Sequence, residues 1–197
     1  DGGTVTDSTV TGVVNGNNNI GGLVGYNDGG GDITRSDTTS NIDGNQGVGG
    51  LVGHNADGTV TASYATGNVS GDDVLGGLIG RSDGEVTASY ATGNVAGEDS
   101  IAAGLIGFNK GTVTESYAIG TVSDTVNGFL SGLVSQNDGD ITDSYWDKGT
   151  TGQGDAIAFG GSGTGVKGFQ TAGGDQPAAE MTGSDALADG NMDALNG

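Results

Sequence analysis

The amino-acid sequence predicts an all-β fold, a right-handed parallel β-helix (β-solenoid) with about five coils of 26–28 residues. Three observations lead to this prediction. One sequence pattern recurs at a nearly constant period, and aliphatic residues occupy fixed columns within it. In addition, only 32% of the residues are hydrophobic, which is too few to fill an ordinary two-layer domain. A slender core that repeats from coil to coil satisfies all three observations.

Three aliphatic columns define each coil. The opening column is Val5, Ile33, Val60, Val86, Val113 and Ile141, with steps of 28, 27, 26, 27 and 28 residues by subtraction. The leucine column is Leu23, Leu51, Leu78, Leu105 and Leu133, and the third column is Val14, Ile42, Val69, Val95 and Val122. Glycine and asparagine turns separate the three segments, so we expect a three-sided coil. The length varies only in the loop before the leucine column, as expected for stacked units with one tolerant corner.

Polar columns support in-register stacking. The position before the opening residue alternates hydroxyl with carboxylate, in the order Thr4, Asp32, Thr59, Glu85, Thr112, Asp140. Carboxylates therefore never lie directly over one another in adjacent coils, where like charges would repel. Three positions after the opening residue, every coil carries a serine: Ser8, Ser36, Ser63, Ser89, Ser116 and Ser144. We expect these small hydroxyl side chains to form a hydrogen-bonded ladder.

A tyrosine column follows the serines and is the candidate ligand-binding surface, a glycan-binding stripe. It consists of Tyr64, Tyr90, Tyr117 and Tyr145. Alternation counted from Ser63 points the tyrosines outward, whereas alternation counted from Val60 points them inward and would also bury Glu115 and Asp143. A bend near Thr61 and Ala62 would reconcile the two counts. The sequence leaves both orientations open and slightly favours buried rings.

Residues 1–145 form the predicted repeat domain, and residues 146–197 form an irregular, glycine-rich C-terminal cap. An open solenoid end exposes strand edges and apolar side chains, so a covering segment is expected there. We interpret Trp146, Phe159 and Phe169 as plug residues. A short, weak helix is predicted from Pro177 to about Leu187, with the proline in its first turn.

The formal net charge of −20 excludes nucleic acid as a plausible partner and disfavours an anionic bilayer. Molar salt would screen the self-repulsion of such a surface, which favours a saline or halophilic habitat. Cysteine is absent, which excludes disulfides and thiolate sites. No apolar stretch is long enough to insert into a membrane. Because the chain starts at Asp1 rather than methionine, we expect it to be part of a longer polypeptide.

The sequence contains few residue patterns suited to catalysis or to metal binding. The one histidine, His54, occupies a variable turn column, so we do not expect a catalytic triad. The acidic pairs Asp72/Asp73, Glu98/Asp99 and Asp138/Asp140 are expected to be solvated charges, because general acid and base catalysis needs a cleft. No cofactor is predicted. Loosely bound Ca²⁺ or another cation is considered at four acidic turns, represented by Asp28, Asp57, Asp83 and Asp138.

The elements GGLVGYN, GGLVGHN, GGLIGRS and AGLIGFN, each followed by a turn and an ATGNV-like strand, resemble the GLUG motif repeats of large secreted and surface proteins. The resemblance covers about residues 1–145, and SYWD and PAAEMTG resemble the segment that commonly closes such arrays. Arg81-Ser82 and Ser135-Gln136 depart from the motif, which predicts interruptions of an asparagine ladder at the third and fifth turns. The resemblance implies an adhesin-like surface array without catalytic residues.

These observations predict a non-enzymatic extracellular module of a larger surface or secreted protein, acting as adhesin, stalk or matrix scaffold. Its expected partners are surface glycans or further copies of itself. One alternative is a polysaccharide-binding or polysaccharide-degrading β-helix. The other is an ice-binding solenoid, suggested by the Thr-x-Thr rungs at Thr4/Thr6, Thr59/Thr61 and Thr112/Thr114, although carboxylates on the intervening rungs argue against it.

Overall fold

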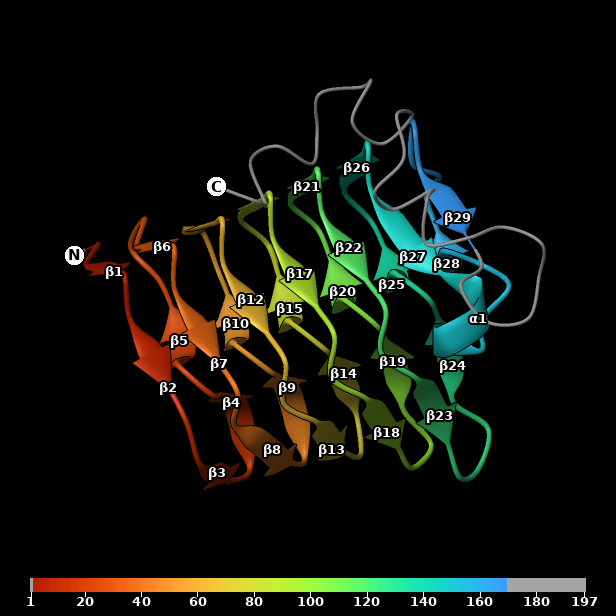
Figure 1. The fold of residues 1–197 in the computed structure, drawn as a ribbon, viewed down its shortest axis with the longest axis horizontal. Helices are drawn as coiled ribbons and strands as arrows, with labels where there is room; N and C mark the ends of the chain where they lie inside the picture. Colours follow the sequence, from red (N-terminus) through yellow and green to blue (C-terminus); the bar gives the residue numbers. More distant parts are fainter. Residues whose placement is uncertain (1, 170–197) are drawn as a thin grey trace.

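The computed structural model describes residues 2–169, and its ribbon is a stack of similar coils with the N-terminus at one end (Figure 1). Strands of successive coils pair in parallel and in register, and they form five sheets that run the length of the stack. The predicted parallel β-solenoid is confirmed. It has about six turns rather than five, because two of the sheets contain six strands and one contains seven.

Sheets A and B begin each coil. Sheet A contains β1 (Thr4–Thr6), β6 (Asp32–Thr34), β11 (Thr59–Thr61), β16 (Glu85–Thr87), β21 (Thr112–Thr114) and β26 (Asp140–Thr142). Sheet B contains β2 (Thr9–Val10), β7 (Asp37–Thr38), β12 (Tyr64–Ala65), β17 (Tyr90–Ala91), β22 (Tyr117–Ala118), β27 (Tyr145–Asp147) and β29 (Lys167–Phe169).

Sheets C, D and E complete each coil. Sheet C contains β3 (Val13–Asn15), β8 (Asn41–Gly44), β13 (Val69–Gly71), β18 (Val95–Gly97) and β23 (Val122–Asp124). Sheet D contains β4 (Asn18–Gly21), β9 (Gln46–Gly49), β14 (Val74–Gly76), β19 (Ile101–Ala103) and β24 (Phe129–Ser131). Sheet E contains β5 (Val24–Asn27), β10 (Val52–Asn55), β15 (Ile79–Ser82), β20 (Ile106–Asn109), β25 (Val134–Asn137) and β28 (Ile157–Gly160).

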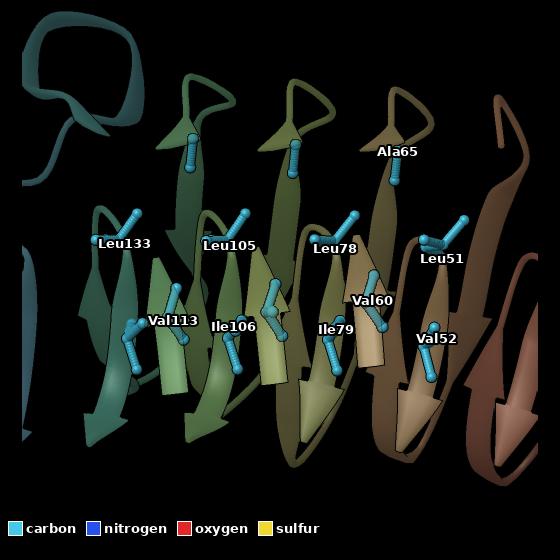
Figure 2. Packing of buried hydrophobic residues seen from close by; sticks show 14 of the residues in the cluster. Leu51, Val52, Val60, Ala65, Leu78, Ile79, Leu105, Ile106, Val113 and Leu133 are labelled. Carbon is cyan, nitrogen blue, oxygen red and sulfur yellow. The ribbon is translucent and has the colours of Figure 1, made fainter. Parts of the chain in front are cut away.

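The core consists of two separate clusters. The larger cluster contains the opening and leucine columns, whose side chains repeat layer by layer (Figure 2). The smaller contains the third column together with Val48, Leu75 and Ala102 of sheet D. Sheet D lies within the segment that the sequence suggested was only a variable loop. Each full coil therefore contains five short strands, whereas the sequence pattern predicted three aliphatic segments. Leu75 was missed because glycines and acids surround the one apolar pair Val74-Leu75.

Glycines of the Gly-Gly-Leu element allow sheets D and E to approach at backbone distance. A Cβ atom on Gly49 would collide with the carbonyl oxygen of Val52 and lie 2.6 Å from the nitrogen of Gly80. A Cβ on Gly80 would lie 2.6 Å from the carbonyl carbon of Gly47. This close contact separates the two clusters, and it explains why the motif needs small residues on both sides of its leucine.

The corner between sheets A and B turns on a residue in the left-handed backbone region. In the third coil this residue is Ala62, at φ 49°. The equivalent residues in the other coils are Asp7, Arg35, Ala88, Glu115 and Asp143, with φ between 45° and 51°. The turn breaks the alternation of inward and outward side chains, so that both Val60 and Ser63 point inward. The bend considered from the sequence is therefore present. The alternation counted from Ser63 holds beyond the bend, whereas the alternation counted from Val60 ends at it.

The serine side chains satisfy the hydrogen bonds of backbone groups at this corner. The N–H of Ser63 donates to Oγ of Ser89 in the next coil at 3.2 Å, and the Oγ–H of Ser63 donates to the carbonyl oxygen of Thr61 at 2.8 Å. The same pair of bonds recurs along the column from Ser8 to Ser116. From Ser36 onward the serines are buried, and they satisfy backbone groups that the turn leaves unpaired.

The C-terminal part of the described chain continues the stack. The ring of Trp146 is 6% exposed within the larger cluster, and its Nε1–H donates to the carbonyl oxygen of Gln153 at 3.0 Å. A single-turn helix, α1 (Lys148–Thr151), follows β27. Phe159 lies in the outward-facing column opposite Gln136 and contacts the ring of Phe129, so it is not a core plug. The side chain of Phe169 and the predicted helix at 177–187 lie outside the described residues.

Candidate binding surface

The tyrosine column lies on the outside of sheet B, half-buried, because the corner turn fixes its direction. Ser63 and Ala65 on either side of Tyr64 are fully buried, so Tyr64 must face outward. Tyr90, Tyr117 and Tyr145 pair with it in register in successive coils. The slight preference for buried rings was wrong, because the left-handed residue at the corner resets the alternation.

Adjacent rings stack face to face. The centroids of Tyr64 and Tyr90 lie 4.8 Å apart with an interplanar angle of 2°, and Tyr90 and Tyr117 are related by 4.8 Å and 6°. Coil spacing imposes this distance, since strands in a sheet are about 4.8 Å apart. Both faces of Tyr90 are covered by neighbouring tyrosines. A sugar therefore cannot stack on the face of Tyr90, whose ring edge and hydroxyl group are left for a ligand. Glycan binding stays a prediction, restricted to these atoms.

Burial raises the pKa of the hydroxyl groups of Tyr64, Tyr90 and Tyr117. Desolvation raises the pKa of Tyr117 to about 12, with a further contribution from Tyr90. The pKa of Tyr64 is raised by desolvation and then by the charge of Asp37 and a hydrogen bond to it. Asp37 lies opposite Tyr64 in the preceding coil. These three phenols are therefore neutral hydrogen-bonding groups throughout the physiological range.

The acidic turns lie at the end of sheet E. Asp28, Asp57 and Asp138 are exposed, and Asp83 is partly buried. Asp83 already accepts hydrogen bonds from Arg81 and from His54, at 3.1 Å and 2.9 Å. Within residues 2–169, no three or more His, Cys, Asp or Glu side chains gather to hold a metal ion. The prediction of loose cation binding stays untested at these four turns.

The acidic pairs and His54 do not converge. Asp72/Asp73, Glu98/Asp99 and Asp138/Asp140 are all exposed, on turns or outer strand positions. The imidazole of His54 contacts Asp83 and the ring of Tyr26, whose centroid lies 4.9 Å away in an edge-to-face arrangement. These contacts hold surface side chains together along sheet E, and they resemble no acid–base constellation.

The variable column of His54, which the sequence suggested was a turn, lies within the strands of sheet E. It carries Tyr26, His54, Arg81, Phe108, Gln136 and Phe159. The guanidinium of Arg81 and the ammonium of Lys110 lie 4.8 Å and 5.3 Å from the centroid of the Phe108 ring. Such cation–π contacts stabilise the exposed face of a sheet. The expectation of a solvated turn was wrong, because strand pairing continues through this variable position and Phe108 is only 9% exposed.

A buried asparagine ladder runs beside this column. The Nδ2 of Asn27 donates to Oδ1 of Asn55 at 2.8 Å, and Asn109 and Asn137 form the same bond. Ser82 interrupts the ladder at the third turn, as predicted. The fifth turn retains it, because Ser135 and Gln136 leave Asn137 itself in place, so the interruption predicted there was wrong.

The stacked coils, the buried columns and the tolerant corner define a β-solenoid repeat protein. Residues 16–43 and 44–70 match the family described as the GLUG motif. Among curated proteins, halomucin of the halophile Haloquadratum walsbyi (strain DSM 16790 / HBSQ001) is 48% identical over 54 residues, 27% of this chain. The match spans 1% of the length of halomucin. No solved structure matches. The two family matches confirm the predicted GLUG-motif resemblance for residues 16–70.

In the described part of the chain, no helix has the length and apolar character needed to cross a membrane.

Proposed function

We propose that this chain is a non-catalytic, extracellular repeat module of a larger surface protein, acting as a stalk, matrix scaffold or adhesin. One observation carries the proposal: all five sheets stack in register along the described chain. Each coil adds one strand spacing to a stiff rod, and the rod holds its two ends apart. Such a shape suits a spacer or a display surface.

The surface chemistry supports a non-catalytic role. General acid and base catalysis requires a cleft that alters the pKa of its groups, whereas the candidate carboxylates are exposed. The similarity to halomucin supports a place in a large surface or secreted protein of a halophile. The net charge of −20 makes nucleic acid an unsuitable partner and suits a saline medium.

The location test uses the full parent protein in intact cells. Antibodies against residues 1–145 should label unpermeabilised cells or the culture medium, and added protease should remove the signal from the cells. Labelling only after permeabilisation would overturn the extracellular assignment.

Small-angle scattering of the full chain should give an elongated particle. Turnover of a polysaccharide panel by the purified chain would overturn the non-catalytic assignment.

Glycan binding is a second candidate function, favoured by the outward row of tyrosine edges. Because both ring faces of Tyr90 are covered and one face of Tyr117 is stacked on it, hydrogen bonds from the hydroxyl groups would carry recognition. Tyr90→Phe and Tyr117→Phe retain the stacked rings and remove these groups, so they should abolish binding on a glycan array. The matched control is Tyr26→Phe on sheet E, which should leave glycan binding unchanged. Binding that survives in the doubly substituted chain would exclude the tyrosine stripe.

A further inference from the structure

One tripeptide in the sequence has the form Asn-x-Ser/Thr with a residue other than proline in the middle: Asn68-Val69-Ser70. This is the acceptor pattern for N-linked glycosylation of exported proteins, in which the hydroxyl residue is read together with the asparagine. We propose that Asn68 carries an N-linked glycan. The inference rests on the proposed extracellular location.

Asn68 lies where a glycan has room. It precedes β13 at the corner between sheets B and C, and it is exposed, whereas its neighbours Gly67 and Val69 are buried. Its Oδ1 accepts the backbone N–H of Asn94 from the next coil at 3.0 Å. Among the described residues, its Nδ2 makes no hydrogen bond. The atom that would be modified is therefore free, while the other end of the amide is held in place.

The hydroxyl group of the tripeptide also lies at the surface. Ser70 is partly exposed, and its Oγ–H donates to Oδ1 of Asp43 at 2.7 Å. Both polar members of the tripeptide thus remain accessible on the edge of the rod. Other asparagines, such as Asn55 and Asn109, are fully buried in the ladder of sheet E.

The repeat supplies internal controls for this site. Asn41 and Asn94 occupy the same corner in the preceding and following coils, both are exposed, and each has an Oδ1 that accepts the backbone N–H of the next coil at 3.0 Å. Asn94 has the same immediate neighbours as Asn68, Gly93 and Val95 matching Gly67 and Val69, and differs two residues further on, where Ala96 replaces the serine; at Asn41 the corresponding residue is Asp43. The three asparagines share a geometry, and between Asn68 and Asn94 the hydroxyl residue is the one difference within the tripeptide.

The modification is compatible with the fold. Attack of the Asn68 amide nitrogen on C1 of a lipid-linked oligosaccharyl (pyro)phosphate forms the N-glycosidic bond, breaks the C1–oxygen bond, and releases the lipid (pyro)phosphate and one proton. An oligosaccharyltransferase would catalyse this exchange, in which nothing is oxidised or reduced. The amide oxygen persists in the product, so the hydrogen bond from Asn94 is retained.

The test uses the full chain, directed to the secretory route of a host that transfers N-linked glycans. Trypsin cleaves after Arg35, Arg81 and Lys110, which places Asn68 and Asn94 on different peptides. Tandem mass spectrometry should find a glycan on Asn68 and none on Asn94. Ser70→Ala should remove it. Ala96→Ser should create a second glycan at Asn94, because it completes the tripeptide in an equivalent corner.

The reporter glycoprotein of the host must itself be modified. If Asn68 is then unmodified in the exported chain, the proposed glycosylation site is refuted. Retention of the glycan in Ser70→Ala would overturn it too. Both results leave the surface function untouched, since that function is tested by antibody labelling of intact cells. Circular dichroism of each substituted chain should match the parent, because Ser70 and Ala96 contribute exposed side-chain surface.

Discussion

The Nδ2 of Asn109 donates to Oδ1 of Asn137 at 2.8 Å, and both side chains are fully buried. Asn109 continues this ladder toward the C-terminus but not toward the N-terminus, because Ser82 holds the preceding position. The Oδ1 of Asn109 is consequently buried without a donor in the described structure. A buried acceptor without a partner costs about 1–3 kcal/mol.

Ser82→Asn should therefore stabilise the protein. Its carboxamide would donate to Oδ1 of Asn109 and accept from Nδ2 of Asn55, as at the other rungs. We expect the free energy of unfolding to rise by about 1–2 kcal/mol, measured by denaturant titration. Asn55→Ser, which interrupts the intact part of the ladder, should lower it by a similar amount. A fall in stability for Ser82→Asn would show that the site cannot hold the larger side chain.

Ala62→Gly should also stabilise the protein. A left-handed backbone costs an alanine about 1–2 kcal/mol, whereas glycine adopts it freely. Part of the gain is offset by the larger entropy of glycine in the unfolded chain, so we expect a net increase of roughly 0.5 kcal/mol in the free energy of unfolding. The control is Ala96→Gly, on the exposed side of β18, where the sign should reverse. Equal effects at the two positions would argue against corner strain.

Alkaline pH should destabilise the tyrosine column. The folded pKa of Tyr117 is about 12, above the ordinary value of about 10. A raised pKa means that the unfolded chain loses its proton first, so stability is fully present below pH ~10 and is lost as the pH rises toward 12. Melting temperatures measured across this range should fall, and Tyr117→Phe should flatten the fall. An unchanged slope in that variant would locate the alkaline sensitivity elsewhere.

Acidic pH should destabilise the turn around Asp124. Burial opposes ionisation there, but hydrogen bonds from Ser100, Val126 and Gly128 outweigh it and lower the pKa to about 2. The Ser100 hydroxyl and the Val126 N–H each donate at 2.8 Å. Because the folded pKa is depressed, this stabilisation is present above the ordinary Asp pKa and is lost as pH falls from about 4 toward 2.

Asp124→Asn should lower the melting temperature at neutral pH and reduce its fall in acid. The carboxamide keeps one acceptor oxygen and presents an N–H where a donor already points. Asp72→Asn, at an exposed turn position, serves as the charge-matched control and should have little effect. Identical acid profiles for the two variants would contradict a special role for the Asp124 hydrogen bonds.

Salt should stabilise the whole rod. With a net charge of −20, self-repulsion is large in dilute buffer, and molar salt shortens the Debye length to about 3 Å. The melting temperature should rise with potassium or sodium chloride. Equal stability in dilute buffer and in molar salt would contradict adaptation to a saline medium. Calorimetry with Ca²⁺ and with chelator separates general screening from binding at Asp28, Asp57, Asp83 or Asp138.

The sequence by itself determined the stacking. A constant period places Val60 over Val86 and Thr59 over Glu85, because any other register would expose aliphatic residues or superpose carboxylates. The third-turn interruption at Ser82 was likewise visible, since equivalent positions in a solenoid are equivalent in space. The tertiary structure decided what depends on backbone conformation rather than on residue type.

The left-handed turn at Ala62 is such a case, because alanine has no intrinsic preference for that region and the neighbouring coils impose it. That turn directs Tyr64 outward and makes the rings of Tyr64 and Tyr90 cover one another. The burial of Leu75 and the hydrogen bonds around Asp124 were decided in the same way. The packing partners of Leu75 and the Ser100 donors to Asp124 come from adjacent coils, so no local pattern contains them.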